Sequence, residues 1–355
     1  MPISSDPGTV RTAYQVWQEA EGIPVIRGFY VEDLRTVELK PWARKGGKGV
    51  FIELEGTGGT NDSYVCEIPP GGTLEPQRHF YEEVIYVIKG RGATSVWVEG
   101  GPKVTFEWQA GSLFAIPLNA WHQHFNGSGT EVARYYGVTT APLVMNLFHN
   151  HDFIFNNPFV FKDRFTGEQN SFNGKGAFIA TRIWEANFIP DVNTFQLIEW
   201  KERGAGGRNV MFELSNNTMI AHISEFPVGT YKKAHRHGPG AHVIILGGKG
   251  YSLLWRDGDK HTKVDWHQGS VFVPPEFWWH QHFNAGAAPA RYLAIRWGSV
   301  KHKLDEKFSK IDQDKEKGGN QIEYPNEDPL VPQIFESELA KAGVQSRMPQ
   351  VLAAR

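Results

Sequence analysis

The sequence predicts an all-β protein built from two tandem β domains, with short helices near its ends. Three observations lead to this prediction. Short runs rich in Val, Ile, Phe, Tyr and Trp are separated by Gly and Pro along most of the chain, as in a sandwich or barrel. The same residues recur at a fixed offset of 158 positions. The length of 355 residues exceeds one typical domain and suits two.

The repeat is the strongest of these observations. A hexapeptide, Trp-His-Gln-His-Phe-Asn, begins at Trp121 and recurs unchanged at Trp279. Self-similarity at a fixed period marks tandem domains, and chance in an aromatic-rich chain does not give so many identities. The other pairs at this offset are Trp42 and Trp200, Glu67 and Glu225, Gly71 and Gly229, His79 and His237, Trp97 and Trp255, Trp108 and Trp266, Gly111 and Gly269, and Pro117 and Pro275.

The repeat divides the chain into four parts. Residues 1–140 form an N-terminal arm and the first barrel, and residues 141–187 form a connector rich in Asn and Phe. Residues 188–298 form the second barrel, and residues 299–355 form a charged, helical C-terminal tail. Long loops in compact proteins usually have a function or pack over a surface, so we expect the connector to pack over one barrel as a lid.

Local patterns predict the elements within these parts. Tyr14–Gly22 has the pattern of a short amphipathic helix that ends at glycine. In the tail, the charged stretch Lys301–Lys317 predicts a solvated helix or linker, and Pro332–Gly343 predicts a final amphipathic helix. The strands expected in the first half are Val50–Leu54, Ser63–Ile68, Val84–Ile88, Ala93–Val98, Ser112–Ile116 and Val132–Val138.

Composition narrows the classes of function. The net charge of −2 gives no electrostatic footprint for nucleic acid or an anionic membrane. The single cysteine, Cys66, excludes an internal disulfide and suits a reducing compartment. The polar start lacks a signal peptide, and no apolar run reaches the length of a membrane span. We therefore expect a cytoplasmic protein that acts on a small molecule and forms a homo-oligomer through exposed barrel edges and terminal arms.

Four histidines of the second half predict a metal site. His235 and His237 lie two apart and point to one face of an extended strand. The Gly238–Gly240 break allows His242 to re-enter beside them, and a closed β architecture places His280 opposite. The alternative, four hydrogen-bonded core histidines, would need many polar partners at one point. Such imidazoles suit Fe, Zn, Ni or Cu, with Mn also possible.

These residues make the sequence resemble the cupin superfamily, and in particular gentisate-dioxygenase-like bicupins. The first cupin motif is G-x5-H-x-H-x3/4-E-x6-G, and the second is G-x5-P-x-G-x2-H-x3-N. The resemblance covers about two thirds of the chain and implies two tandem cupin barrels of the jelly-roll, or double-stranded β-helix, type. The matching positions are Gly229, His235, His237, Gly269, Pro275, His280 and Asn284 in the second half, and Gly71, His79, Glu83, Gly90, Gly111, Pro117, His122 and Asn126 in the first.

Departures from the motifs distinguish the two barrels. The second half lacks the glutamate, and His242 stands where the longer spacing would place it, as a fourth ligand or near neighbour. The first half keeps His79, Glu83 and His122 but has Gln77 in place of the first histidine. Gln77 is therefore either a weak oxygen ligand or the sign of a degenerate site. We expect the working metal centre in the second barrel.

The resemblance implies a metal-dependent dioxygenase, most simply with Fe(II), although Mn, Ni, Cu or Zn are alternatives. Its substrates would be O2 and a small hydroxyaromatic or other chelating, oxygen-rich acid. Arg296 is expected either to reach a substrate carboxylate or to form a core salt bridge, and His282 either to donate a hydrogen bond near the metal or to pack at the rim.

Two other functions stay open. In a lyase, decarboxylase or isomerase without redox chemistry, Mn, Zn or Ni would act as a Lewis acid, with Glu83 as an acid–base group. A non-enzymatic storage-like or regulatory bicupin ranks last, because such members usually lose their metal histidines and this chain retains His235, His237 and His280.

Overall fold

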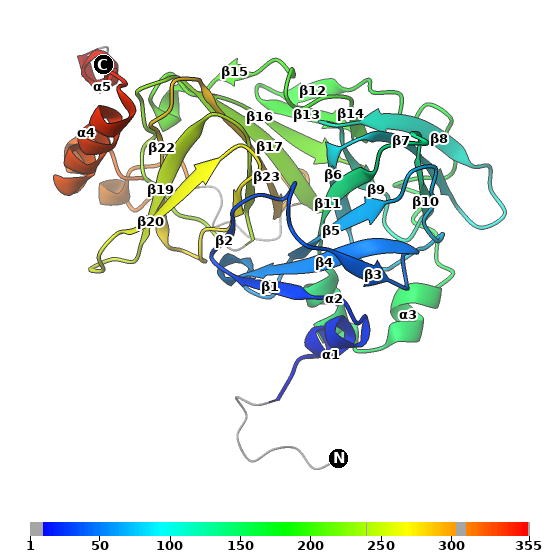
Figure 1. Ribbon diagram of the computed structural model, residues 1–355. Coiled ribbons are helices and arrows are strands. Elements are labelled where there is room, and N and C mark those ends of the chain that lie inside the picture. Colours follow the sequence, from blue (N-terminus) through cyan, green and yellow to red (C-terminus); the bar gives the residue numbers. More distant parts are fainter. Residues whose placement is uncertain (1–9, 239, 303–309, 354–355) are drawn as a thin grey trace.

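The strands of the first half form a barrel of two facing sheets (Figure 1). The computed structural model describes residues 10–238, 240–302 and 310–353. One sheet has eight strands in the order β1-β4-β5-β11-β6-β9-β14, with β3 on β4, and the other has the order β10-β7-β8. The strands from this half are β1 Val25–Gly28, β3 Lys40–Trp42, β4 Gly47–Leu54, β5 Asp62–Ile68, β6 Glu83–Lys89, β7 Arg91–Trp97, β8 Val104–Gln109, β9 Leu113–Ile116, β10 Trp121–Asn126 and β11 Ala133–Thr139.

The second half repeats this arrangement, which confirms the predicted all-β fold of two tandem barrels. Its large sheet has nine strands in the order β12-β13-β16-β17-β23-β18-β21-β2, with β15 on β16, and its small sheet has the order β20-β19-β22. The strands are β12 Ala177–Ala180, β13 Ile183–Ala186, β15 Ile198–Glu199, β16 Arg208–Leu214, β17 Met219–Phe226, β18 His242–Gly247, β19 Lys249–Trp255, β20 Thr262–His267, β21 Val271–Phe272, β22 Trp279–Asn284 and β23 Ala290–Trp297.

Each half also lends a short strand to the other barrel. Strand β2 (Tyr30–Val31) belongs to the N-terminal arm but pairs with β21 of the second barrel. Strand β14 (Phe188–Ile189) follows the connector but pairs with β9 of the first barrel. The exchange covers one edge of each large sheet, and it links the two barrels through backbone hydrogen bonds.

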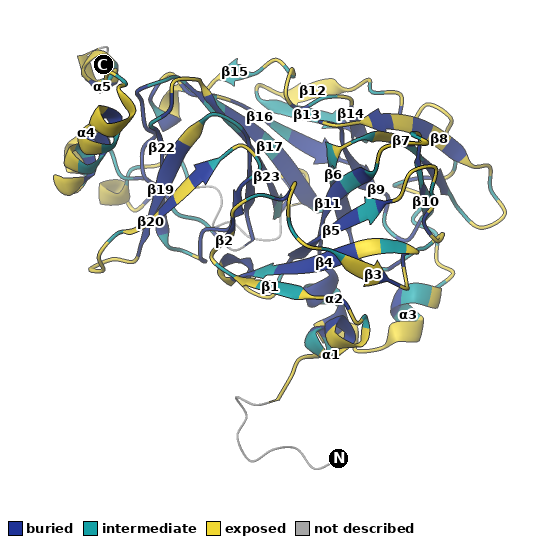
Figure 2. Cartoon of the chain, viewed as in Figure 1, coloured by how far each residue is buried: buried dark blue, intermediate teal, exposed yellow. Residues whose placement is uncertain are grey.

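The two large sheets also share one apolar core. A single cluster joins Val50, Ile52 and Val84 of the first barrel to Phe212 and Ile244 of the second. Figure 2 shows that buried residues concentrate in the sheets, while helices and loops carry most of the exposed ones. A continuous apolar interface of this kind favours two barrels that are rigidly joined.

Helices lie outside the barrels. Thr12 and Gln15 form a capping box at the start of α1, and the connector contains two helices and the strands β12 and β13, so it has more regular structure than a loop. Helix α4 buries its apolar side against the small sheet of the second barrel. No helix in the described ranges is long and apolar enough to cross a membrane. The helices are α1 Ala13–Ala20, α2 Ala141–Phe148, α3 His151–Asn156, α4 Leu330–Ala342 and α5 Met348–Ala353, with 3-10 turns η2 Glu55–Thr57, η3 Lys201–Arg203, η5 Lys315–Lys317 and η6 Tyr324–Asn326.

The tail differs from the expected solvated segment. Residues 303–309 of the predicted stretch Lys301–Lys317 lie outside the described residues. Beyond them, Asp312 forms an ion pair of 2.9 Å with Arg203, whose side chain is almost fully buried. The charges of this stretch therefore do not all face solvent, because one of them neutralises a cation in the second barrel.

Candidate metal centres

In the first barrel, three predicted ligands converge. His79 lies in the loop before β6, Glu83 begins β6, and His122 lies on β10. One ligand atom of each lies within 4.8 Å of the others. Glu83 Oε2 is 3.5 Å from His79 Nε2 and 3.6 Å from His122 Nε2. All three atoms are buried, and none has a hydrogen-bond partner among the residues that the structure describes. Burying three polar atoms without partners at one point costs free energy, and a metal ion bound to all three would remove this cost.

The ring orientations also suit a metal. His79 Nδ1 lies 2.8 Å from the Tyr81 carbonyl oxygen, and His122 Nδ1 lies 3.3 Å from that of Ala120. A carbonyl oxygen only accepts, so each Nδ1 carries the proton and each Nε2 presents a lone pair. Two ligand atoms about 2.1 Å from one ion in tetrahedral geometry lie about 3.4 Å apart, close to the spacing seen here.

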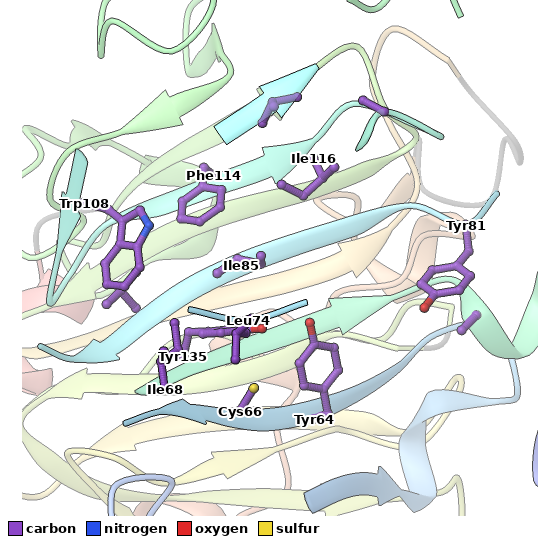
Figure 3. Packing of buried hydrophobic residues seen from close by; sticks show 14 of the residues in the cluster. Tyr64, Cys66, Ile68, Leu74, Tyr81, Ile85, Trp108, Phe114, Ile116 and Tyr135 are labelled. Atoms are coloured by element: carbon purple, nitrogen blue, oxygen red, sulfur yellow. The ribbon is translucent and has the colours of Figure 1, made fainter. Parts of the chain in front are cut away.

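A buried lysine is part of this site. Lys45 Nζ is 3.0 Å from the Tyr64 hydroxyl, which donates to Glu83, and 3.4 Å from Gln77 Oε1. Burial alone would raise the pKa of Glu83, but the Lys45 ammonium and the nearby imidazoles hold that pKa well below its usual range. Gln77 Oε1 therefore already accepts a hydrogen bond from the Lys45 ammonium. Figure 3 shows Tyr64 within the apolar interior of this barrel.

In the second barrel, His235, His237 and His280 form an all-histidine cluster within the same 4.8 Å limit. The Nε2 atoms of His235 and His280 are 3.1 Å apart. Backbone carbonyls lie 2.8 Å from His237 Nδ1, at Gly238, and 3.0 Å from His280 Nδ1, at Trp278, so these two rings also present Nε2. Burial lowers the pKa of His235 and His237 well below the usual value, and that of His280 to about 4. The imidazoles are thus neutral at pH 7, the form that binds metals.

The structure does not bring His242 into this cluster, which corrects the expected fourth ligand. At the offset of 158, His242 matches Val84, and Ala241 matches Glu83. The His242 side chain is fully buried on the opposite face of β18, where Nδ1 lies 2.8 Å from the Tyr136 hydroxyl of the first barrel. A shift of one residue along a strand moves a side chain to the opposite face of the sheet. The longer spacing of the first cupin motif is one residue too long here, so it predicted the wrong face for His242.

His282 and Arg296 both lie close to the cluster. Trp266 donates to the Ser252 hydroxyl at 3.0 Å, and this hydroxyl lies 2.8 Å from His282 Nδ1. The Ser252 hydroxyl accepts from the indole N–H and can donate its own hydrogen bond to Nδ1, an arrangement that places the His282 proton on Nε2. The His282 and His280 ring centres are 5.7 Å apart. Arg296 lies on β23 near enough to lower the pKa of His237, an effect smaller than those of burial and of His280.

Sequence reasoning missed Lys45, Tyr64 and Arg203. The available signal was the repeat itself, because Lys45 and Arg203 are both cations at the offset of 158. Single residues without a motif around them gave no other indication.

Comparisons with known proteins agree with this architecture. Residues 64–139 match the family model described as a cupin domain. A search of curated proteins finds no match. Two variants of oxalate decarboxylase from Bacillus subtilis have TM-scores of 0.51, with 16% identity over 79% of this chain and 80% of theirs, and 17% over 84% and 88%. A third structure, from work on the Mn(II) centres of that enzyme, has a TM-score of 0.50 and 18% identity over 82% and 86%. The first barrel thus contains a match to the cupin domain model, and the chain as a whole shares the two-barrel fold of these structures.

Proposed function

We propose that this chain is a metal-dependent enzyme that acts on a small carboxylic acid at the second barrel, with His235, His237 and His280 as metal ligands. The observation that carries the proposal is the convergence of three neutral imidazoles, two of them buried and that of His237 half-buried, with no carboxylate among them. Ala241 stands where the first barrel has Glu83. Neutral ligands leave a divalent ion its full charge, which favours an anionic, chelating substrate.

A bound divalent ion would supply Lewis-acid polarisation of a substrate carboxylate or carbonyl oxygen. The side chains around it have separate tasks. Arg296 is suited to bind a carboxylate through its fork of N–H donors. With Ser252 donating to its Nδ1, His282 would carry its proton on Nε2 within the buried interior, where it can donate to a substrate oxygen and keep that oxygen oriented.

The reaction class that we favour is non-redox cleavage, such as decarboxylation, with Mn(II) as the metal. The support is the fold shared with Bacillus subtilis oxalate decarboxylase, an enzyme described with Mn(II) centres. This ranks the lyase alternative above the dioxygenase that the sequence first suggested. Glu83 is then a ligand of the first barrel, since its pKa lies well below the range of a general acid at neutral pH.

A second candidate is the Fe(II) dioxygenase acting on a hydroxyaromatic acid and O2. The observation in its favour is the ligand set of the second barrel, which holds histidines alone and thereby resembles that of dioxygenases within the superfamily. The two candidates differ in their demand for oxygen.

Metal analysis with turnover assays tests both. Protein purified without added metal, together with the His280→Ala and His122→Ala variants, is measured for Mn, Fe and Zn. A panel of small oxo- and hydroxy-acids is then followed for CO2 release and O2 uptake. We expect the parent protein to contain metal in the second barrel and the His280→Ala variant to lose it. We also expect CO2 release without O2 uptake. Stoichiometric O2 uptake would favour the dioxygenase, and a second barrel that takes up no metal would refute both.

A further inference from the structure

The segment around His235 in the second barrel lies between two other segments. On one side, the backbone N–H groups of His235 and His280 each donate to the other's carbonyl oxygen, at 3.0 and 2.8 Å. On the other side lies the tail segment, defined as residues 310–323. There the Arg236 N–H donates to the Asn320 carbonyl at 3.0 Å, and the Ile322 N–H donates to that of Ala234 at 2.9 Å. The backbone of His235 itself thus bonds to His280, while its two neighbours, Ala234 and Arg236, bond to the tail segment on the other side.

Buried side chains fix the tail segment in this place. Gln321 is 1% exposed, and it forms a bridge with His235. Its Oε1 accepts from Arg203 at 3.1 Å, and its Nε2 donates to the Glu202 carbonyl at 3.1 Å. Arg203, also 1% exposed, has its charge neutralised by Asp312. Because an unpaired buried guanidinium would be costly, this ion pair opposes release of the segment.

The first barrel has no such arrangement. Gln77, which matches His235, exchanges backbone hydrogen bonds with His122 at 3.0 and 2.9 Å, in the same way as its counterpart. Within the described part of the chain, no other segment forms a bridge with Gln77. The cation that matches Arg203 is Lys45, which contacts Tyr64 and Gln77 inside the barrel. In the described residues, this additional backbone pairing is therefore found at the all-histidine centre and not at the centre of the first barrel.

We propose that the tail segment is a positioning element of the second metal centre and that Gln321 is its principal residue. It holds the backbone of His235 so that Nε2 stays aligned with those of His237 and His280. Groups that orient metal ligands typically change metal affinity by about 10- to 100-fold when they are removed. Because binding energies are reciprocal, a bound metal must stabilise the docked tail segment by the same factor. The inference rests on the proposed metal site of the second barrel.

The test compares Gln321→Ala with Lys317→Ala, a change at an exposed residue of the same segment. Both are made in a His122→Ala background, which removes a predicted ligand of the first barrel. Affinity for Mn(II) is measured by chelator competition, the visible spectrum of bound Co(II) reports ligand geometry, and hydrogen exchange is followed over residues 310–323 with and without metal. Circular dichroism checks that each variant is folded, and Asp312→Asn provides a milder second perturbation.

We expect Gln321→Ala to weaken Mn(II) binding by about 10-fold and to alter the Co(II) spectrum, while Lys317→Ala changes neither. In the parent protein, metal should slow amide exchange in the tail segment. Two results would overturn this inference alone. One is an unchanged Mn(II) affinity and Co(II) spectrum in folded Gln321→Ala, and the other is amide exchange in the tail segment that is the same with and without metal. A parent that binds no metal would instead overturn the proposed function on which it rests.

Discussion

Replacing His242 by valine, the residue at the matching position 84, should reverse the order of stability between neutral and acidic pH. His242 is fully buried in the interface between the barrels, and burial lowers its pKa to about 3. Its unfolded pKa is about 6.5. The folded state therefore binds fewer protons than the unfolded state below that value, and the stability that neutral His242 permits is lost as the pH falls from 6.5 towards 3.

The magnitude follows from the two pKa values. Each unit of separation is worth about 1.36 kcal/mol, so protonation of His242 in the unfolded state costs about 2 kcal/mol of stability at pH 5 and almost nothing at pH 7. The His242→Val variant escapes this cost. It also loses the hydrogen bond to Tyr136, at about 1 kcal/mol. The variant should thus be about 1 kcal/mol less stable at pH 7 and about 1 kcal/mol more stable at pH 5.

The assay measures the free energy of unfolding in urea for the metal-free parent and the metal-free His242→Val variant at both pH values. Both proteins contain the other histidines, so the contributions of those residues cancel in the difference. Metal uptake is measured on the same variant. Because His242 lies outside the cluster, uptake at the second barrel should be unchanged. A difference in stability that does not vary with pH would refute the burial argument, and loss of metal would refute the assignment of His242 to the interface.

Three further predictions concern the two centres. Lys45→Met should raise the pKa of Glu83, so that protons compete with metal and the metal affinity of the first barrel falls more at pH 5 than at pH 7. Chelator competition at both pH values, in His280→Ala protein, measures this affinity. An equal loss of affinity at the two pH values would contradict the prediction. Arg296→Met should raise KM for a carboxylate substrate by at least about 10-fold with metal content unchanged, and an unaltered KM would remove Arg296 from the binding site. His282→Phe should lower kcat by about 100-fold while metal content stays constant, and a loss of metal would instead make His282 a ligand.

The sequence predicted more of the fold than of the chemistry. The offset of 158 was sufficient to predict two barrels, because homologous domains must share a fold. The HxH spacing and the later histidine correctly predicted that His235, His237 and His280 lie together, although His235 and His237 precede β18 in a segment with only isolated bridges and not in the expected strand. The prediction for His242 was wrong because successive residues of a strand face opposite sides, so an error of one residue places the side chain on the wrong face. The tail segment was not predictable from local pattern, because its pairing with His235 joins residues far apart in sequence and depends on where the chain returns.

The residues at matching positions of the two barrels favour the second barrel as the proposed site for an anion. In the first barrel, the interior contains both the Glu83 carboxylate and the Lys45 ammonium, and their charges offset each other. In the second, alanine replaces the carboxylate, and Asp312 neutralises Arg203 from the tail. A divalent ion would therefore add its charge to an interior that has no acidic ligand and has Arg296 nearby. The same ion in the first barrel would face Glu83 directly, and less of its charge would remain for a substrate.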